Sequence, residues 1–173
     1  MTISDYTVTE AGFGADLGAE KFLDTKCRVA GIQPDCIVVV ATVKALKLHG
    51  GADKAELSKE NIPALRAGLP NLLKHVDNVV KVYNKPAVVA MNAFATDTQA
   101  EIEEVLSACN KVGVKAVFTD VFLKGGEGGV KLAEAVLKEC DKTSDLHYAY
   151  DLNDGIVKKI EDVVKTYTAG TEP

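Results

Sequence analysis

The chain alternates between short runs rich in β-branched residues and longer stretches in which apolar residues recur every three or four positions. The short runs have the length and composition of β-strands. They predict strands at residues 5–9, 36–41, 87–91 and 115–119. The run "CIVVVA", 36–41, is apolar at nearly every position, which is expected of a strand covered on both faces.

Apolar stripes at helical spacing predict helices between and after these strands. Ala19, Leu23, Cys27 and Ala30 are spaced by four, four and three residues and precede Gly31, a typical helix end. Further stripes run through residues 69–83, 102–112, 130–140 and 156–167. Strands alternating with helices indicate a single α/β domain over 1–173, with a mostly parallel sheet flanked by helices.

Ligands of parallel sheets bind beyond the carboxyl ends of the strands, so the segments that follow the predicted strands are candidates for a site. These segments read "EAGFGADLG", "TVKALKLHGG", "NAFATDT" and "DVFLKGGEGG". They are rich in glycine, and they carry the aromatic residues Phe13, Phe94 and Phe122. Asp97 precedes the capping pair Thr98 and Glu101, and we expect it to help cap the helix that follows.

The glycine motifs do not match a known phosphate-binding fingerprint. Gly12 to Gly18 lacks the lysine and the hydroxyl of G-x-x-x-x-G-K-[ST], and its spacing also departs from G-x-G-x-x-G. The pattern leaves two alternatives open, a tight strand-to-helix turn and a loop that lines a ligand. The same alternatives hold for "KGGEGG", where Glu127 disfavours a phosphate.

Composition and charge argue against two classes of partner, nucleic acids and membranes. The 173 residues are 47% hydrophobic and 26% charged, with a net charge of −5, which argues against nucleic acid. No apolar run approaches the roughly 18 residues needed to cross a bilayer, so no membrane partner is expected. The four cysteines form no C-x-x-C pair and no metal-ligand spacing with histidine, so we expect free thiols and a cytoplasmic protein.

Several long stretches resemble one enzyme family. "VTEAGFGADLGAEKF" and "KCRVAGIQPDCIVVVATVKALKLHGG" closely resemble formate–tetrahydrofolate ligase, also called formyltetrahydrofolate synthetase. The likeness resumes at "NAFATDTQAEIEEV", "KGGEGGVKLAEAV" and "YDLNDGIVKKIE", and so covers nearly the whole chain in collinear order.

The resemblance implies a Rossmann-like, three-layer part of a P-loop-NTPase-type ligase. Such an enzyme uses ATP with Mg²⁺ to convert formate to formyl phosphate, and N10 of tetrahydrofolate then takes the formyl group. Family enzymes are much longer and form homo-oligomers, and their P-loop and the arginine that handles formyl phosphate lie upstream of anything in this chain. We therefore expect an internal segment, inactive alone, whose partners are tetrahydrofolate, ATP, formate and the remainder of the ligase.

The resemblance also implies roles for individual residues. Phe94 and Phe122 would sandwich the pterin, with Phe118 lining the same slot. Relatives usually carry tryptophan where Phe122 stands and often proline where Ala95 stands, which favours weaker folate binding here. The residues expected to line the nucleotide and acyl-phosphate site are Glu10, Gly12, Phe13 and Gly14.

Three alternatives stay open at this point. The chain could be a stand-alone folate- or nucleotide-binding module without chemistry, or a scaffold fragment without a ligand. Phe94 and Phe122 could also be core residues rather than ligand contacts.

Overall fold

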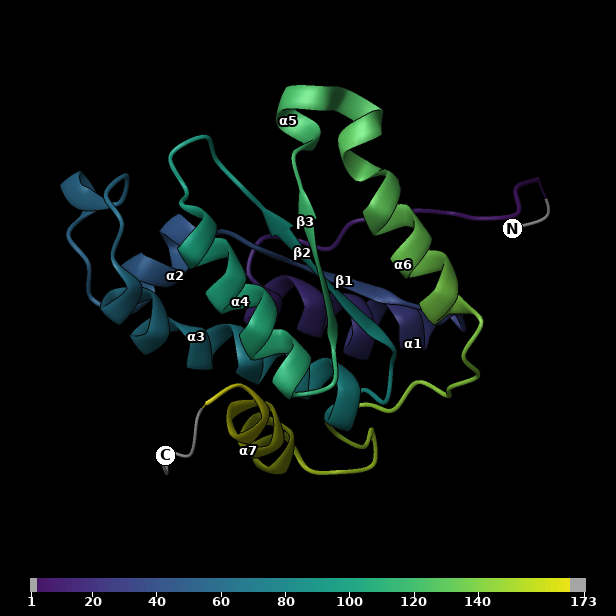
Figure 1. Ribbon diagram of the computed structural model, residues 1–173. Coiled ribbons are helices and arrows are strands. Elements are labelled where there is room, and N and C mark those ends of the chain that lie inside the picture. The colour runs from purple at the N-terminus through teal and green to yellow at the C-terminus, as the bar shows by residue number, and fades with distance from the viewer. Residues whose placement is uncertain (1–2, 169–173) are drawn as a thin grey trace.

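A computed structural model describes residues 3–168 and has a three-stranded parallel sheet at its centre (Figure 1). The strands β1 (Ile37–Ala41), β2 (Ala87–Asn92) and β3 (Lys115–Thr119) lie in the order β1-β2-β3. Val39 pairs with Val89, which pairs with Ala116 on the other side. The α/β class with a parallel sheet flanked by helices is therefore confirmed.

The strand predicted at residues 5–9 is wrong. Residues 3–14 contain no helix or strand and run alongside the sheet as an extended, exposed segment (Figure 1). Within residues 3–168, none of this segment's backbone groups hydrogen-bonds to β1. A strand needs a partner for its N–H and C=O groups, and a local sequence pattern cannot supply one.

The first helix begins after Gly14 and runs without interruption to Gly31. It consists of η1 (Ala15–Ala19), η2 (Lys21–Cys27) and α1 (Arg28–Ala30), and its first two parts have wider, π-type turns. Gly31 has φ 62°, the left-handed conformation that ends helices and favours glycine. The predicted helix end is confirmed, and Leu23 and Cys27 of the predicted stripe are buried, whereas Ala30 is exposed.

The remaining helices connect and follow the strands. β1 leads through α2 (Val43–His49), η3 (Lys54–Glu56), α3 (Ile62–Asp77) and η4 (Asn78–Val82) to β2, and α4 (Gln99–Lys111) joins β2 to β3. After β3 come α5 (Val121–Lys124), η5 (Gly125–Gly129), α6 (Val130–Cys140) and α7 (Ile156–Tyr167). The Thr98–Glu101 capping box opens α4 as expected. In the described part of the chain, no helix combines the length and the apolar character that a membrane span requires.

The main core fills the space between one face of the sheet and the helices α2, α3 and α4 (Figure 1). Val89 and Met91 of β2 are fully buried there against Leu46 and Leu65 of the helices. α2 and α3 cross closely because Gly68 sits against the Leu46 backbone, where a Cβ atom would collide. This packing fixes α2, and with it the segment that leaves β1.

The opposite face is only partly covered. α6 packs mainly on β2 and β3 and buries Val88 and Val117 (Figure 1). Val38 and Val40 of β1 are exposed, Val40 to 65%. The expectation that 36–41 is covered on both faces is therefore wrong for this chain. Val130 and Leu137 of the α6 stripe are exposed as well.

An ion pair is buried between the helices at the core's edge. The Lys47 ammonium lies 2.8 Å from a Glu101 carboxylate oxygen, and both side chains are inaccessible to solvent. Lys47 also donates to the carbonyl of Lys59, and Glu101 accepts from the backbone amide of Asn61. Burial alone would raise the pKa of Glu101, but these donors outweigh it and hold the pKa below its usual range.

A second buried carboxylate, that of Asp24, links the first helix by hydrogen bonds to the C-terminal part of the chain. Asp24 accepts hydrogen bonds from the Tyr83 hydroxyl at 2.9 Å and from the Ala149 amide at 2.8 Å. The Tyr83 and Tyr167 hydroxyls are 2.7 Å apart, which joins α7 to the same network. Burial raises the pKa of Tyr167 to about 12, so the hydroxyl keeps its proton and the network stays intact at neutral pH.

Removing one partner of the buried Lys47–Glu101 pair should destabilise the folded protein. We expect Lys47→Met to lower the free energy of unfolding by about 3–5 kcal/mol, because Glu101 would remain buried without its counter-ion. Urea denaturation followed by circular dichroism measures the change. Arg66→Met is the matched control, since it removes the cation of the exposed Arg66–Glu104 pair and should leave the midpoint unchanged. Equal losses in both variants would contradict this account of the pair.

Candidate functional site

The three strands end side by side, and the segments that leave them form one edge of the molecule (Figure 1). β1 leads directly into α2, β2 into the loop 93–98, and β3 into α5. The Thr119 hydroxyl donates to the carbonyl of Met91 at 3.4 Å, and the Ala93 amide donates to the carbonyl of Thr119 at 3.3 Å. These bonds hold the ends of β2 and β3 together, so the loops beyond them have fixed starting points.

The loop 93–98 is a tight turn closed by Asp97. The Phe94 amide donates to Asp97 Oδ2 at 2.8 Å, and the Asp97 amide donates to the Phe94 carbonyl at 3.0 Å. The capping box of Thr98 and Glu101 caps α4, so the expected helix-capping role of Asp97 is replaced by this turn-closing one. Burial raises the pKa of Asp97, and its Oδ1 atom is buried without a hydrogen-bond partner.

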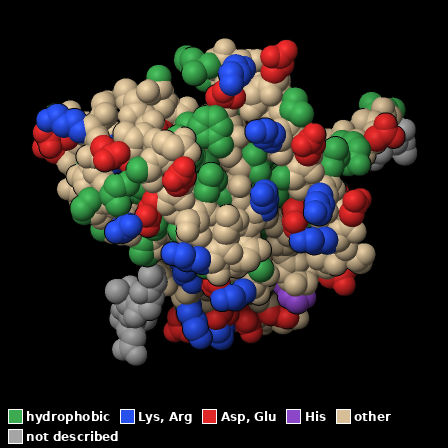
Figure 2. All heavy atoms as spheres, viewed as in Figure 1, with side chains coloured by type: hydrophobic (Ala, Val, Ile, Leu, Met, Phe, Trp, Pro, Cys, Tyr) green, Lys and Arg blue, Asp and Glu red, His purple; other side chains and the backbone are tan. Residues whose placement is uncertain are grey.

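The aromatic residues expected to hold a pterin are exposed at this edge. Phe94 is 45% exposed, Phe118 39% and Phe122 91%. They come from the loop after β2, from β3 itself and from α5, and hydrophobic side chains gather at this edge beneath α5 (Figure 2). A core role is therefore excluded for Phe122, whose ring contributes almost nothing to the buried interior.

A lysine that sequence reasoning did not single out lies beside Phe94. The Lys44 ammonium is 4.6 Å from the centroid of the Phe94 ring, a cation–π contact. Among the described residues it makes no hydrogen bond and no ion pair. Lys44 is one of the two lysines in "TVKALK", and only the packing of α2 against the loop 93–98 reveals its place.

The "KGGEGG" segment forms the turn between α5 and α6. Gly125 has φ 59°, and a Cβ atom on Gly128 would lie 2.7 Å from Asp120 at the start of α5. Asp120 is also paired with Lys124 at 2.6 Å. The conformation of the turn accounts for Gly125 and its close packing accounts for Gly128, whereas neither effect requires glycine at Gly126 or Gly129.

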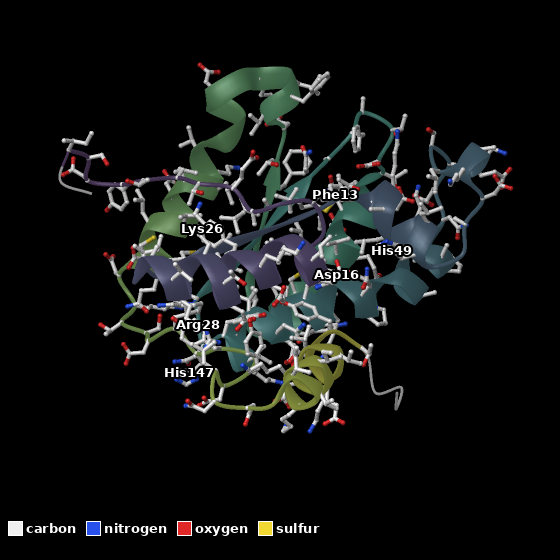
Figure 3. The ribbon with its side chains drawn as sticks, turned by 180° about the vertical axis from the view of Figure 1, so that it is seen from behind. Phe13, Asp16, Lys26, Arg28, His49 and His147 are labelled. Carbon is white, nitrogen blue, oxygen red and sulfur yellow. The ribbon has the colours of Figure 1, made fainter. Side chains whose placement is uncertain are left out.

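The loop 9–18 is held to the first helix by its own glycines. A Cβ atom on Gly18 would collide with the backbone of Gly12, and the Gly18 amide donates to the Gly14 carbonyl at 2.6 Å. Gly14 has φ 78°. The turn geometry therefore accounts for Gly14 and Gly18, and Phe13 is fully exposed at the loop's apex, above the first helix (Figure 3).

The polar residues of the loop are less constrained than its glycines. Glu10 is exposed and Gly12 lies beside it in the extended part of the loop.

Among residues 3–168, no three His, Cys, Asp or Glu side chains gather closely enough to hold a metal ion. All four cysteines are free.

The chain matches a known protein family. The family model described as "Formate--tetrahydrofolate ligase" matches residues 1–172, essentially the whole chain.

The glycine contact in the first loop can be tested directly. We expect Gly18→Ala to lower the free energy of unfolding by about 1–3 kcal/mol, because its Cβ atom must displace the Gly12 backbone. Hydrogen exchange should also show faster exchange of the Gly18 amide, whose acceptor is the Gly14 carbonyl. Gly155→Ala is the control, since nothing lies within 4 Å of a Cβ atom there. An unchanged Gly18 variant would mean that the loop is not packed on the helix as described.

Proposed function

Because the chain belongs to the formate–tetrahydrofolate ligase family, we propose that it supplies the folate side of that enzyme's active site. Tetrahydrofolate would bind at the carboxyl edge of the sheet, with its pterin ring among Phe94, Phe118 and Phe122. The observation that carries the proposal is the exposure of Phe122, 91%, at an edge where parallel sheets bind ligands.

The aromatic residues are suited to a flat, partly polar ring. Offset or edge-to-face contacts with an aromatic face add about 0.5–1.5 kcal/mol to the gain from buried area. The turn 94–97 is closed by two hydrogen bonds, so Phe94 is presented by a defined backbone rather than by a loose loop. Such preorganisation lowers the entropy lost when the ligand binds.

The chemistry requires more than this chain contains. N10 of tetrahydrofolate attacks the formyl carbon of formyl phosphate, and phosphate leaves. A phosphate cradle with Mg²⁺ and a cationic clamp would have to stabilise the charges of that step. The sequence has no G-x-x-x-x-G-K-[ST], so we assign the ATP and Mg²⁺ contacts chiefly to the remainder of the ligase. Glu10, Gly12, Phe13 and Gly14 would form the wall that faces that part.

Exposed apolar faces support a larger assembly. Val38 and Val40 lie open on β1, and Ile156, Val157 and Ile160 lie open on α7. Exposed apolar side chains on one face of a strand or helix are typical of faces that another polypeptide covers. The remainder of the ligase is the partner that we propose for them.

A non-catalytic folate-binding module remains the second candidate. It is favoured by the same exposed aromatic residues, since these need no phosphate chemistry to bind a pterin. The two candidates differ only in whether turnover appears when the rest of the enzyme is supplied.

Folate binding can be measured on the purified chain. We expect calorimetric titration with tetrahydrofolate to give saturable binding that Phe122→Ala weakens by about 1–3 kcal/mol, the scale of a lost aromatic contact. The unfolding midpoint of this variant should not change, because the ring is 91% exposed. Ile156→Ala, on the exposed face of α7, is the control for loss of surface apolar area. Unchanged affinity in Phe122→Ala would remove Phe122 from the site.

Turnover should be absent from the isolated chain. With ATP, formate and tetrahydrofolate present, we expect no ADP above background in a coupled assay, because the P-loop motif is missing. ADP formation that depends on all three substrates would overturn the division of the site that we propose.

A further inference from the structure

Asp97 uses one of its two carboxylate oxygens to build the turn and leaves the other without a partner. Oδ2 accepts the Phe94 amide at 2.8 Å. Oδ1 is buried, and no donor in the described residues reaches it. An acceptor removed from water without a replacement donor costs about 1–3 kcal/mol, so such an atom calls for an explanation.

The surroundings of Asp97 favour a bound donor over a structural role. The turn needs only Oδ2, and the helix that follows is capped by Thr98 and Glu101. Burial raises the pKa of Asp97, as expected for a carboxylate that has lost water and has too few hydrogen-bond donors around it. A metal ion is a poor candidate because the described residues bring no three acidic, histidine or cysteine side chains together here.

The residue beside Asp97 indicates what kind of donor would fit. Phe94 shares the turn with Asp97, and the Lys44 ammonium lies 4.6 Å from the centroid of the Phe94 ring, which is 45% exposed. A flat heterocycle stacked on Phe94 would displace that ammonium, which gives up no hydrogen bond or ion pair that the described residues provide. Solvent does not reach Oδ1 in the described structure. Displacement of Lys44, whose charge acts on Asp97, would open the way to this atom while the turn keeps its two hydrogen bonds.

We propose that Asp97 is the specificity-determining residue for the pterin ring, with Oδ1 accepting hydrogen bonds from the ring's 2-amino group and N3–H. This inference rests on the proposed folate site, since it requires a pterin stacked on Phe94. The 2-amino-4-oxopyrimidine edge of a pterin presents adjacent N–H donors, and an ionised carboxylate is an acceptor without donors. A carboxylate therefore selects a 2-amino ring and disfavours a ring that has a carbonyl oxygen at the same position.

Asp97→Asn tests this selection without removing the turn. The amide oxygen of asparagine can still accept the Phe94 amide, while its NH₂ group takes the place of Oδ1 and becomes a donor. The ligands are tetrahydrofolate and its analogue with a carbonyl oxygen in place of the 2-amino group, both titrated by calorimetry under anaerobic conditions. We expect the wild-type chain to prefer tetrahydrofolate by about tenfold to a hundredfold, and the variant to lose or reverse this preference.

Two further variants separate the possible outcomes. Asp151→Asn makes the same chemical change in a turn ahead of α7, where Asp151 accepts the Asn153 amide, and should keep the wild-type preference. Phe94→Ala should weaken both ligands about equally, because stacking does not distinguish them.

Each result decides a different question. If Phe94→Ala weakens binding but Asp97→Asn keeps the preference for tetrahydrofolate, the role of Asp97 is overturned and the folate site stands. If the wild-type chain binds neither ligand, the folate site itself is overturned, and the role of Asp97 falls with it.

Discussion

The buried ion pair between Lys47 and Glu101 is the interaction on which the arrangement of the site depends. Lys47 belongs to α2, which follows β1, and Glu101 belongs to the first turn of α4, which follows β2. The pair therefore locks together the two segments that leave neighbouring strands. Lys44 and the turn 94–97 are carried by these same segments, so their contact is a consequence of the buried pair. The Lys59 carbonyl accepts a further hydrogen bond from Lys47, and the Asn61 and Thr98 amides donate to Glu101, which makes the burial of two charges tolerable.

The edge of the sheet combines a rigid base with exposed apolar side chains. Hydrogen bonds between the ends of β2 and β3 and within the turn fix the backbone. Phe94, Phe118 and Phe122 nevertheless remain open, and Asp97 keeps a buried oxygen without a donor. Natural sequences leave such features where a ligand or a partner completes the structure, since exposed rings and unpaired acceptors both cost stability. The chain belongs to a ligase family that acts on tetrahydrofolate, and in the function that we propose this ligand would cover the exposed rings and donate to the buried oxygen.

Several details lay beyond sequence reasoning because they depend on contacts between distant segments. The glycines of "EAGFG" and "KGGEGG" could have marked a ligand loop, but Gly18 packs on Gly12 and Gly128 on Asp120. Asp97 was expected to cap a helix, whereas Thr98 does so and Asp97 closes the turn before it. The role of Lys44 depends on which side of α2 faces the loop after β2, and the spacing of lysines in "TVKALK" does not reveal that.

The sequence by itself determined the elements whose information is local: three of the four predicted strands, the helix that ends at Gly31, the Thr98–Glu101 capping box and the α/β class. The sequence by itself also identified the protein family, because a long collinear resemblance between sequences does not depend on how the chain packs. Only the tertiary structure decided that residues 5–9 lack a strand partner, that Val38 and Val40 lie open, and that Asp97 and Phe94 share one turn beside Lys44. The physical reason is that strand pairing, burial and side-chain contacts are relations between segments far apart in the chain, and the pattern of any one segment leaves them undetermined.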